Sequence, residues 1–182
     1  MLLALNQTAN TLAFVRLVDF PGGHSKFVVR RDPGAHDKWP TPTVRFLEAR
    51  PYILSLSLNA LAATFCFPGG IKSNGNSVTG LYVSLTNPNL NESIMDQRNV
   101  LVLSSSPDLV AWTQGAVLLA DDTGFLDPGD SARFTGFHYV DWQFDGEDDL
   151  IMAVRTAYRG AVSYHNSNRL TYKRIAQFRS LL

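Results

Sequence analysis

Short runs of β-branched and aromatic residues alternate with turn-forming residues along this 182-residue chain. Runs of this kind, bounded by Gly, Pro, Asn and Asp, are typical of β-strands. Helical periodicity is weak throughout, so the fold class is predicted to be all-β. The predicted strands are Leu12–Val18, Lys26–Arg31, Leu81–Leu85, Asn99–Ser104, Ala116–Leu119, Tyr139–Phe144, Leu150–Arg155 and Arg169–Ile175.

Most of these strands fall into two groups that follow one another along the chain. The first group has four strands within Lys26–Leu119, and the second has three within Tyr139–Ile175. The dipeptide Asp145-Gly146 is the clearest hairpin turn. Meanders of four antiparallel strands are the blades of β-propellers, but a β-sandwich can give the same strand pattern. The pattern alone leaves both architectures open.

The segment 35–76, called the insert below, differs in composition from the rest of the chain. It contains Pro40, Pro42 and Pro51, then Leu/Ser/Ala repeats, then a stretch rich in Gly and Asn. Without it, VVRRDPG would run into TGLYVSLTN through an ordinary hairpin loop, and forty residues far exceed the usual loop length. The insert is either a surface excursion or non-native sequence, such as a translated intron, and we favour the second interpretation.

Composition and charge exclude several classes of function. Sixteen basic residues balance sixteen acidic ones, which argues against a nucleic-acid partner. The single cysteine, Cys66, rules out an internal disulfide and a thiolate cluster, and the four histidines lack metal-ligand spacing, so no metal or cofactor is expected. The most apolar window, Ile53–Phe67, is too short to span a bilayer, so no membrane partner is expected. The N-terminal run lacks a signal-peptide core, and the localisation stays open.

Three parts of the sequence resemble the last two blades of sialidase-like β-propellers, in the group of five- or six-bladed glycoside-hydrolase and neuraminidase-repeat folds. They are Phe20–Pro33, Gln97–Trp112, and Tyr139–Tyr158 followed by His165–Arg179. The ending DWQFDG…RTAY…N-x-L-T-x-x-R-I-x-x-F-R is the most specific part, because it is long and its spacing is fixed. The resemblance implies a partial β-propeller of about two four-stranded antiparallel blades.

The motif Ser106-x-Asp108-Leu109-x-x-Trp112 resembles the Asp-box turn of sialidases, but it lacks the glycine of that motif and is one residue shorter. Asp108 is expected to accept hydrogen bonds from backbone N–H groups between the third and outer strands of a blade. Trp112 is expected to pack between sheets. The predicted role of the motif is structural.

Ligand sites in such propellers form where the innermost strands begin. His24 and Lys26 open one such strand and are candidate substrate-binding residues. In the first strand of the second group, Tyr139–Phe144, alternation places Asp141 and Gln143 on one face. The carboxylate of Asp141 is a candidate catalytic acid, base or sugar-positioning group, with Gln143 binding substrate. Alternatively, Asp141 caps a turn or bonds the neighbouring blade.

The resemblance also implies roles for two arginines, a tyrosine and a histidine. Sialidases hold the substrate carboxylate with several arginines and use a tyrosine nucleophile, which makes Arg98 and Arg155 candidate substrate-binding residues and Tyr158 a candidate catalytic residue. His165, in an Asn-rich loop before the last strand, is a candidate for sugar contact. Alternatively, Arg155 is a buried bridge between blades and the loop of His165 forms turns.

The predicted function is that of the C-terminal portion of a sialidase-like, carbohydrate-active propeller. Its full-length form is expected to be a glycoside hydrolase acting on a carbohydrate or glycoconjugate by acid/base chemistry. Two alternatives stay open: a non-catalytic glycan-binding propeller, and an inactive fragment.

Overall fold

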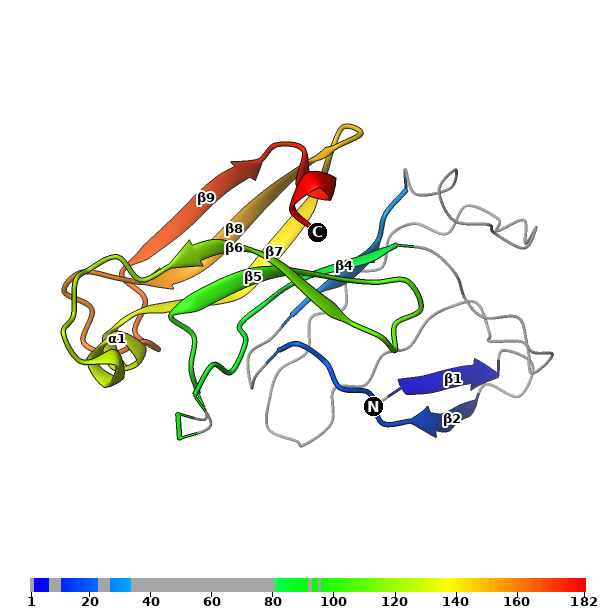
Figure 1. Cartoon of the computed structure of the whole chain (residues 1–182), viewed down its shortest axis with the longest axis horizontal. Coiled ribbons are helices and arrows are strands. Elements are labelled where there is room, and N and C mark those ends of the chain that lie inside the picture. Colours follow the sequence, from blue (N-terminus) through cyan, green and yellow to red (C-terminus); the bar gives the residue numbers. More distant parts are fainter. Residues whose placement is uncertain (1, 7–10, 23–26, 34–80, 92, 95) are drawn as a thin grey trace.

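The structure is a computed structural model that describes residues 2–6, 11–22, 27–33, 81–91, 93–94 and 96–182 (Figure 1). Its elements in chain order are β1 (Leu2–Asn6), β2 (Thr11–Arg16), β3 (Val29–Arg31), β4 (Tyr82–Thr86), β5 (Val100–Ser106), β6 (Thr113–Ala120), α1 (Pro128–Phe134), β7 (Gly136–Asp145), β8 (Asp149–Ala157), β9 (Arg169–Ile175) and the 3-10 helix η2 (Phe178–Leu181). All strand pairs in the described sheets are antiparallel. The prediction of an all-β protein is confirmed.

Strand order follows chain order in each described sheet. β3, β4, β5 and β6 form a four-stranded sheet, and β7, β8 and β9 form a three-stranded sheet. The predicted grouping of four strands followed by three is therefore confirmed, with no crossover within either sheet. The strand predicted at Leu12–Val18, which belonged to neither group, appears as β2 and pairs with β1 in a separate hairpin.

β3 and β4 are neighbours although the insert separates them in the chain. Val29 pairs with Ser84, and the Asp32 N–H donates to the Leu81 carbonyl at 2.7 Å. This pairing is the one expected if the sequences on either side of the insert form one hairpin. The insert itself, and with it the question of whether it is native, lies outside the described residues.

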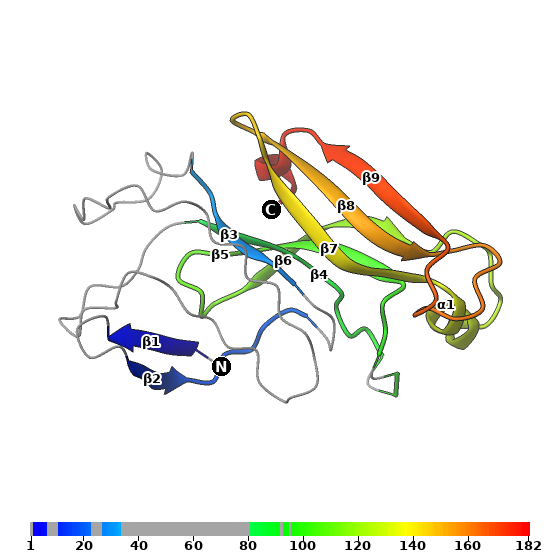
Figure 2. The same ribbon diagram turned by 180° about the vertical axis from the view of Figure 1, so that it is seen from behind.

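The four-stranded and three-stranded sheets stack against each other (Figure 1, Figure 2), and β7 contacts β5 near its start and β3 further along. At one edge, where β3 and β7 meet, the Trp142 indole N–H donates to the Val28 carbonyl at 3.2 Å. There Arg30 Nε also donates to the Trp142 carbonyl at 2.6 Å. At the other edge, Lys173 of β9 donates its ammonium group to the Leu118 carbonyl of β6 at 2.7 Å. The first strands lie together, and so do the last ones.

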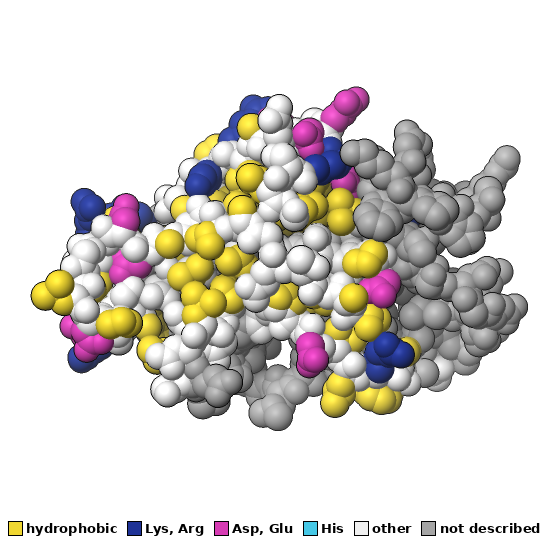
Figure 3. Space-filling model, viewed as in Figure 1, with side chains coloured by type: hydrophobic (Ala, Val, Ile, Leu, Met, Phe, Trp, Pro, Cys, Tyr) yellow, Lys and Arg dark blue, Asp and Glu magenta, His cyan; other side chains and the backbone are white. Residues whose placement is uncertain are grey.

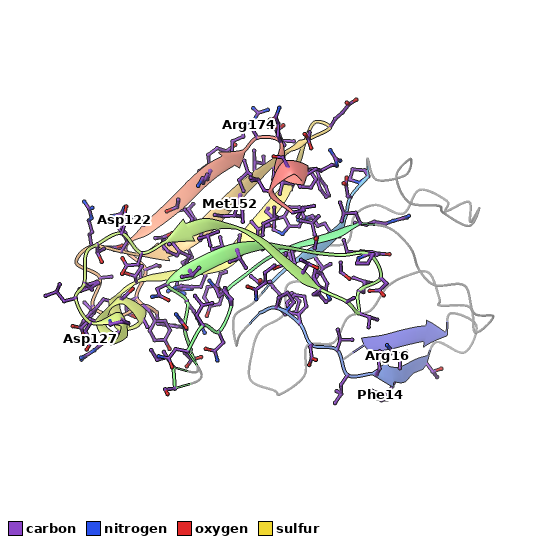
Figure 4. All side chains as sticks on the ribbon, viewed as in Figure 1. Phe14, Arg16, Asp122, Asp127, Met152 and Arg174 are labelled. Atoms are coloured by element: carbon purple, nitrogen blue, oxygen red, sulfur yellow. The ribbon has the colours of Figure 1, made fainter. Side chains whose placement is uncertain are left out.

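Apolar side chains from the two facing surfaces fill the space between these sheets. Alternation along each strand turns every second side chain toward this space. Met152, labelled in Figure 4, is one of them and is 1% exposed. The buried cluster comprises Val28, Val83, Leu85, Leu101, Leu103, Leu118, Phe137, Val140, Trp142, Leu150, Met152, Val154, Ile175 and Phe178. Each large side chain buried here contributes about 1.5–3 kcal/mol, so the shared core holds the two sheets together.

The turn between β5 and β6 is organised by Asp108, as predicted. Asp108 Oδ1 accepts hydrogen bonds from the N–H groups of Val110 and Ala111, both at 2.8 Å. Burial alone would raise the pKa of Asp108, but these bonds and one from Ser106 lower it overall. The expected structural role of this carboxylate is confirmed.

Trp112 at the end of this turn lies elsewhere than expected. Its ring packs edge-on against Phe20, with 4.9 Å between ring centroids, and its indole N–H donates to the Leu109 carbonyl at 3.2 Å. The side chain is half-buried and is not part of the core between the sheets. The expectation that Trp112 packs between sheets is therefore wrong, because Phe20 offers the ring a nearer partner outside the core.

An ion-pair cluster fastens the C-terminal η2 to both sheets. Arg179 donates to both carboxylate oxygens of Asp32, at 2.6 and 2.8 Å, just after β3. It also donates to the Asp148 carboxylate at 2.8 Å in the turn between β7 and β8. Since the carboxylate of Asp32 is fully buried, this two-bond pairing compensates a charge that would otherwise be costly to bury.

The outward faces of the two stacked sheets carry exposed apolar side chains. Leu170 and Tyr172 on β9 are 73% and 68% exposed, and they lie on the side of the sheet that points away from the core. Val117 on β6 is 58% exposed. Figure 3 shows apolar side chains gathered on the face that carries β5 and β6. Exposed apolar surface of this kind favours association with another surface.

We expect Trp142→Phe to lower the free energy of unfolding by about 2 kcal/mol. The substitution leaves space in the core and removes the indole donor to Val28, whose carbonyl keeps the Ser84 hydroxyl as a donor. Trp112→Phe is the matched control, since it also loses a bond to a carbonyl but from a half-buried ring, and it should cost less than about 1 kcal/mol. Urea denaturation measures both, and equal losses would contradict the role given to Trp142.

Candidate functional site

Three of the predicted site residues come together at the end of the sheets where β7 begins, near α1 (Figure 1). Arg98 lies just before β5, Arg155 lies near the end of β8, and His165 lies in the loop between β8 and β9. Side chains from β7 and from the same loop complete the group. The Tyr139 cluster, as we name it, consists of Arg98, His138, Tyr139, Arg155, Tyr164 and His165.

Tyr139 is placed at the centre of the cluster by a bulge in β7. The register of β7 against β8 shifts between His138 and Asp141, and Tyr139 has a φ of 53°, in the left-handed region that non-glycine residues seldom adopt. Bulges re-aim side chains and recur beside functional sites. Here the Tyr139 ring centroid lies 6.0 Å from the Arg98 guanidinium carbon and 5.2 Å from that of Arg155.

The β8–β9 loop is held tightly against the start of β7. The Tyr164 N–H donates to the Arg133 carbonyl at 2.6 Å, and His138 Nε2 lies 3.0 Å from the Tyr164 carbonyl oxygen. A Cβ atom on Gly136 would lie 2.5 Å from that same oxygen, so a glycine is required here for the close approach. The position of the loop therefore depends on residues of β7 that precede the predicted strand.

Arg155 is the second attachment of this loop. Its Nε donates to the Ser167 hydroxyl at 2.7 Å, and its Nη2 donates to the His165 carbonyl at 3.0 Å. The interpretation of Arg155 as a bridge between the sheets does not describe these contacts, since both partners lie in the β8–β9 loop. Arg155 thus orders the loop while its guanidinium stays partly exposed beside Tyr139.

Arg98 is 9% exposed and lacks the partners that a buried guanidinium normally has. Its Nε and Nη1 atoms are buried without a hydrogen-bond partner in the described structure, and its Nη2 lies 3.9 Å from Asp96. The Tyr164 ring covers the guanidinium, with 5.3 Å to the ring centroid. Buried donors without acceptors are costly, so an acceptor that reached Arg98 would bind favourably.

His138 is fully buried in the cluster, and this burial sets its charge. Burial and, after it, the positive charges of Arg98 and Arg155 together lower the pKa of His138 to about 4, against a smaller raising effect of the Tyr164 carbonyl. The imidazole is therefore neutral at physiological pH. Burial and the charge of Asp96 raise the pKa of Tyr164, whose hydroxyl donates to Asp96 at 3.3 Å, so this phenol is also neutral.

Asp141, the predicted catalytic carboxylate, lies outside the Tyr139 cluster. It is the sixth residue of β7, and its exposed side chain forms an ion pair with Arg30 at 3.2 Å. Because Arg30 belongs to β3, the contact matches the alternative in which Asp141 bonds the neighbouring sheet. Gln143 is exposed two residues further along β7. His24 and Lys26 lie outside the described residues.

Tyr158, the other predicted catalytic residue, follows the end of β8. Its hydroxyl donates to the carboxylate of Asp122, which Figure 4 shows at the α1 end of the molecule. The guanidinium carbons of Arg159 and Arg169 lie 5.3 and 4.5 Å from the centroid of its ring. Along β8, Tyr158 lies five residues, about 17 Å, from Ala153, the residue paired with Asp141, so the structure does not bring the two predicted catalytic residues together.

His138, Tyr139 and Tyr164 of the cluster are not among the site residues predicted from the sequence, and neither is Asp96 beside Arg98. His138 counts there as one of four scattered histidines. Its position opposite Arg155 follows when the pairing of β7 with β8 is continued, pair by pair, from the hairpin turn at Asp145-Gly146. This continuation also requires the register shift of the bulge between His138 and Asp141, which the sequence does not indicate. Asp96 gives no sequence signal that distinguishes it from other loop carboxylates.

Scans of the chain against protein-family models, and searches of curated proteins and of solved structures, find no match. Among the residues that the structure describes, no three His, Cys, Asp or Glu side chains are grouped so that they could hold a metal ion. No helix in the same part of the chain is long and apolar enough to cross a membrane. The interpretation of the Tyr139 cluster therefore rests on its geometry and on the sequence resemblance.

We expect Arg98→Met to leave the free energy of unfolding unchanged or to raise it by about 1 kcal/mol. The substitution removes a buried charge with unpaired donors and keeps most of the packing volume. Arg179→Met is the matched control: it breaks the pairing with the buried Asp32 and should cost roughly 2–3 kcal/mol. Chemical denaturation compares the two variants. If Arg98→Met lowered the free energy of unfolding as much as Arg179→Met does, Arg98 would be a stabilising residue and the expectation would be wrong.

Proposed function

We propose that this chain is the C-terminal portion of a sialidase-like, carbohydrate-active β-propeller, and that the complete protein is a glycoside hydrolase. The Tyr139 cluster would form part of its sugar-binding site. The substrate would be a carbohydrate or glycoconjugate that carries a carboxylate, as the sugar acids recognised by sialidases do.

The stacking of the two sheets supports the propeller architecture. Consecutive meanders in which first strand lies by first strand and last strand by last strand are what radial repetition produces. A sandwich with Greek-key connections would instead mix the order of strands within a sheet, and neither stacked sheet does so. The exposed apolar faces are also those that further blades would cover.

The single observation that carries the sugar-acid proposal is the pair of arginines at Tyr139. Arg98 and Arg155 approach the same ring, and Arg98 Nε and Nη1 have no acceptor among the described residues. A guanidinium meets a carboxylate through two parallel hydrogen bonds, which gives both affinity and orientation. Arginines bound to protein carboxylates, such as Arg179, are already neutralised and could not serve this purpose.

The proposed chemistry keeps Tyr158 and Asp141 as catalytic residues with different tasks. Asp122 accepts the hydrogen bond of the Tyr158 hydroxyl, which is the arrangement of a nucleophile beside a general base. Asp141 is exposed on the same sheet but too far from Tyr158 to act on the same glycosidic bond, so it would position a sugar hydroxyl at a second point.

A non-catalytic glycan-binding propeller is the second candidate. It is favoured by the same ion pair between Asp141 and Arg30, and by the distance between Asp141 and Tyr158 along the sheet. A binding protein needs the arginines and aromatic rings of the Tyr139 cluster but no acid/base pair. Binding without turnover by the complete protein would identify this second function.

The binding site is tested with N-acetylneuraminic acid as the acidic probe and methyl galactoside as the neutral one. We expect the acidic sugar to bind at least tenfold more tightly, and Arg98→Lys to remove most of this difference because lysine cannot form the two-bond contact. Arg174→Lys is the matched control, since Arg174 pairs with Asp145 and Asp149 toward the other end of β9. Titration calorimetry measures the affinities. Equal binding of the two sugars would contradict the sugar-acid proposal.

We further expect the 182-residue chain expressed alone to self-associate and to hydrolyse no aryl glycoside. Exposed sheet faces such as that of Leu170 and Tyr172 drive association, and a site shared among blades loses most of its positioning groups. Extension of the chain by upstream blades should restore solubility, as measured by light scattering.

In that longer protein Asp141→Asn should lower turnover more than stability. Clear hydrolysis by the short chain, or full activity of Asp141→Asn, would contradict this expectation.

A further inference from the structure

His138 contacts more members of the Tyr139 cluster than its position inside β7 would suggest. Its Nε2 lies 3.0 Å from the Tyr164 carbonyl oxygen, and its ring stacks on that of His165, with centroids 5.9 Å apart and planes inclined by 15°. Its ring also meets the Tyr139 ring edge-on at 4.7 Å, and across the sheet it pairs with Arg155. One buried imidazole thus joins β7, β8 and the β8–β9 loop.

We propose that His138 is the positioning residue of the sugar site. Its neutral imidazole holds the segment Tyr164–His165 against β7, and protonation of the imidazole releases that segment. The inference rests on the proposed function for its biological meaning, because the segment it positions lies over the arginines that would bind the sugar acid. Tyr164 covers Arg98, and the His165 carbonyl accepts from Arg155.

The hydrogen bonding of His138 defines its tautomer. A carbonyl oxygen can only accept, so Nε2 carries the proton that is donated to Tyr164. In the neutral ring Nδ1 then has a lone pair and no proton, and this atom is buried without a partner in the described structure. Protonation would place an N–H group there with no acceptor, next to two guanidinium groups. The arrangement in which the segment Tyr164–His165 is held against β7, called closed below, therefore opposes protonation of His138 by both hydrogen bonding and charge.

The positively charged groups around His138 among the described residues oppose its protonation. Arg98 approaches from the segment before β5, Arg155 from β8, and His165 from the β8–β9 loop, and each opposes a positive charge on His138. The carboxylate that reaches the cluster, Asp96, lies 3.9 Å from Arg98 and hydrogen bonds the hydroxyl of Tyr164. The Tyr164 carbonyl favours the protonated ring, but its effect is smaller than that of burial.

The sign of the pH dependence follows from these contacts. In the closed arrangement the pKa of His138 is lowered from 6.5 to about 4, whereas a released imidazole in water returns toward 6.5. Between these two values the released state binds a proton that the closed state does not. The equilibrium constant for release therefore rises by up to about tenfold for each pH unit as the pH falls from 6.5 toward 4.

Hydrogen exchange on the ligand-free 182-residue chain tests this directly. The Tyr164 amide, which donates to the Arg133 carbonyl, reports release of the segment, and the Phe178 amide, which donates to the Asp148 carbonyl, reports opening elsewhere. We expect the protection factor of Tyr164, corrected for intrinsic exchange, to fall by about tenfold or more between pH 6.5 and pH 4. The protection of Phe178 should change much less. A parallel fall of both amides would overturn the inference, because it would reflect global stability.

Three variants separate positioning from packing. His138→Gln keeps an amide donor that can reach Tyr164 but does not titrate, so the pH dependence of the Tyr164 amide should disappear. His138→Phe keeps the ring contact with His165 but donates nothing, so protection should be low at every pH. Glu147→Gln removes an exposed carboxylate in the turn between β7 and β8, away from the Tyr139 cluster, and should leave the pH dependence unchanged. Unaltered pH dependence in His138→Gln would overturn the inference.

Sugar binding distinguishes this inference from the proposed function. With N-acetylneuraminic acid as the probe, the affinity of the wild-type chain should rise as Tyr164 protection falls, because release of the segment uncovers Arg98, while that of His138→Gln should stay nearly constant over the same pH range. If the amide behaves as expected but the sugar does not bind at any pH, the positioning role of His138 is supported and the sugar site is refuted. If the sugar binds with an affinity independent of Tyr164 protection, the positioning role is refuted.

Discussion

The burial of Trp142 between the two stacked sheets is the contact on which the rest of the described structure depends. Its indole donates to the Val28 carbonyl, its own carbonyl accepts from Arg30, and the guanidinium of Arg30 lies 5.4 Å from the centroid of its ring. These contacts fix β7 against β3 at one edge, and the Lys173 contact fixes β9 against β6 at the other. Since both edges are fixed, the strands of one sheet cannot slide over those of the other without exposing the shared core.

The Tyr139 cluster forms at one end of this rigid pair of sheets. The bulge in β7 turns Tyr139 toward the arginines, and Gly136 lets the β8–β9 loop approach closely enough to bring Tyr164 over Arg98. The cluster combines a strained backbone with buried donors that have no acceptor in the part of the chain that the structure describes, and both features reduce stability. Such features persist where the surrounding packing is strong, and they concentrate at sites that bind or react. The fully paired Arg179 at the opposite end shows what an arginine with a purely structural role looks like in this protein.

Strands could be predicted from the sequence because their apolar alternation is local, as the match of the prediction with β9 at Arg169–Ile175 illustrates. The start of β7 could not, because Gly136 weakens the strand pattern and its role depends on a loop thirty residues away. The short helix α1 was not predicted either. Asp127-Pro128-Gly129 has the composition of a turn, although in the structure Asp127 caps the helix. The family resemblance singled out Arg98, Arg155 and His165 as candidates, but it did not predict that they lie around Tyr139. The part played by His138 depends on contacts from three separate segments, which no local pattern contains.

The central claim is that the Tyr139 cluster is a binding site for the carboxylate of a sugar, held in place by the stacked sheets. The most direct measurement is a crystal structure of the protein soaked with N-acetylneuraminic acid. The account predicts density for the sugar carboxylate within hydrogen-bond distance, about 2.7–3.2 Å, of both the Arg98 and Arg155 guanidinium groups, with Tyr139 beside the ring. A sugar bound elsewhere on the protein, or an empty cluster at saturating sugar concentration, would contradict it.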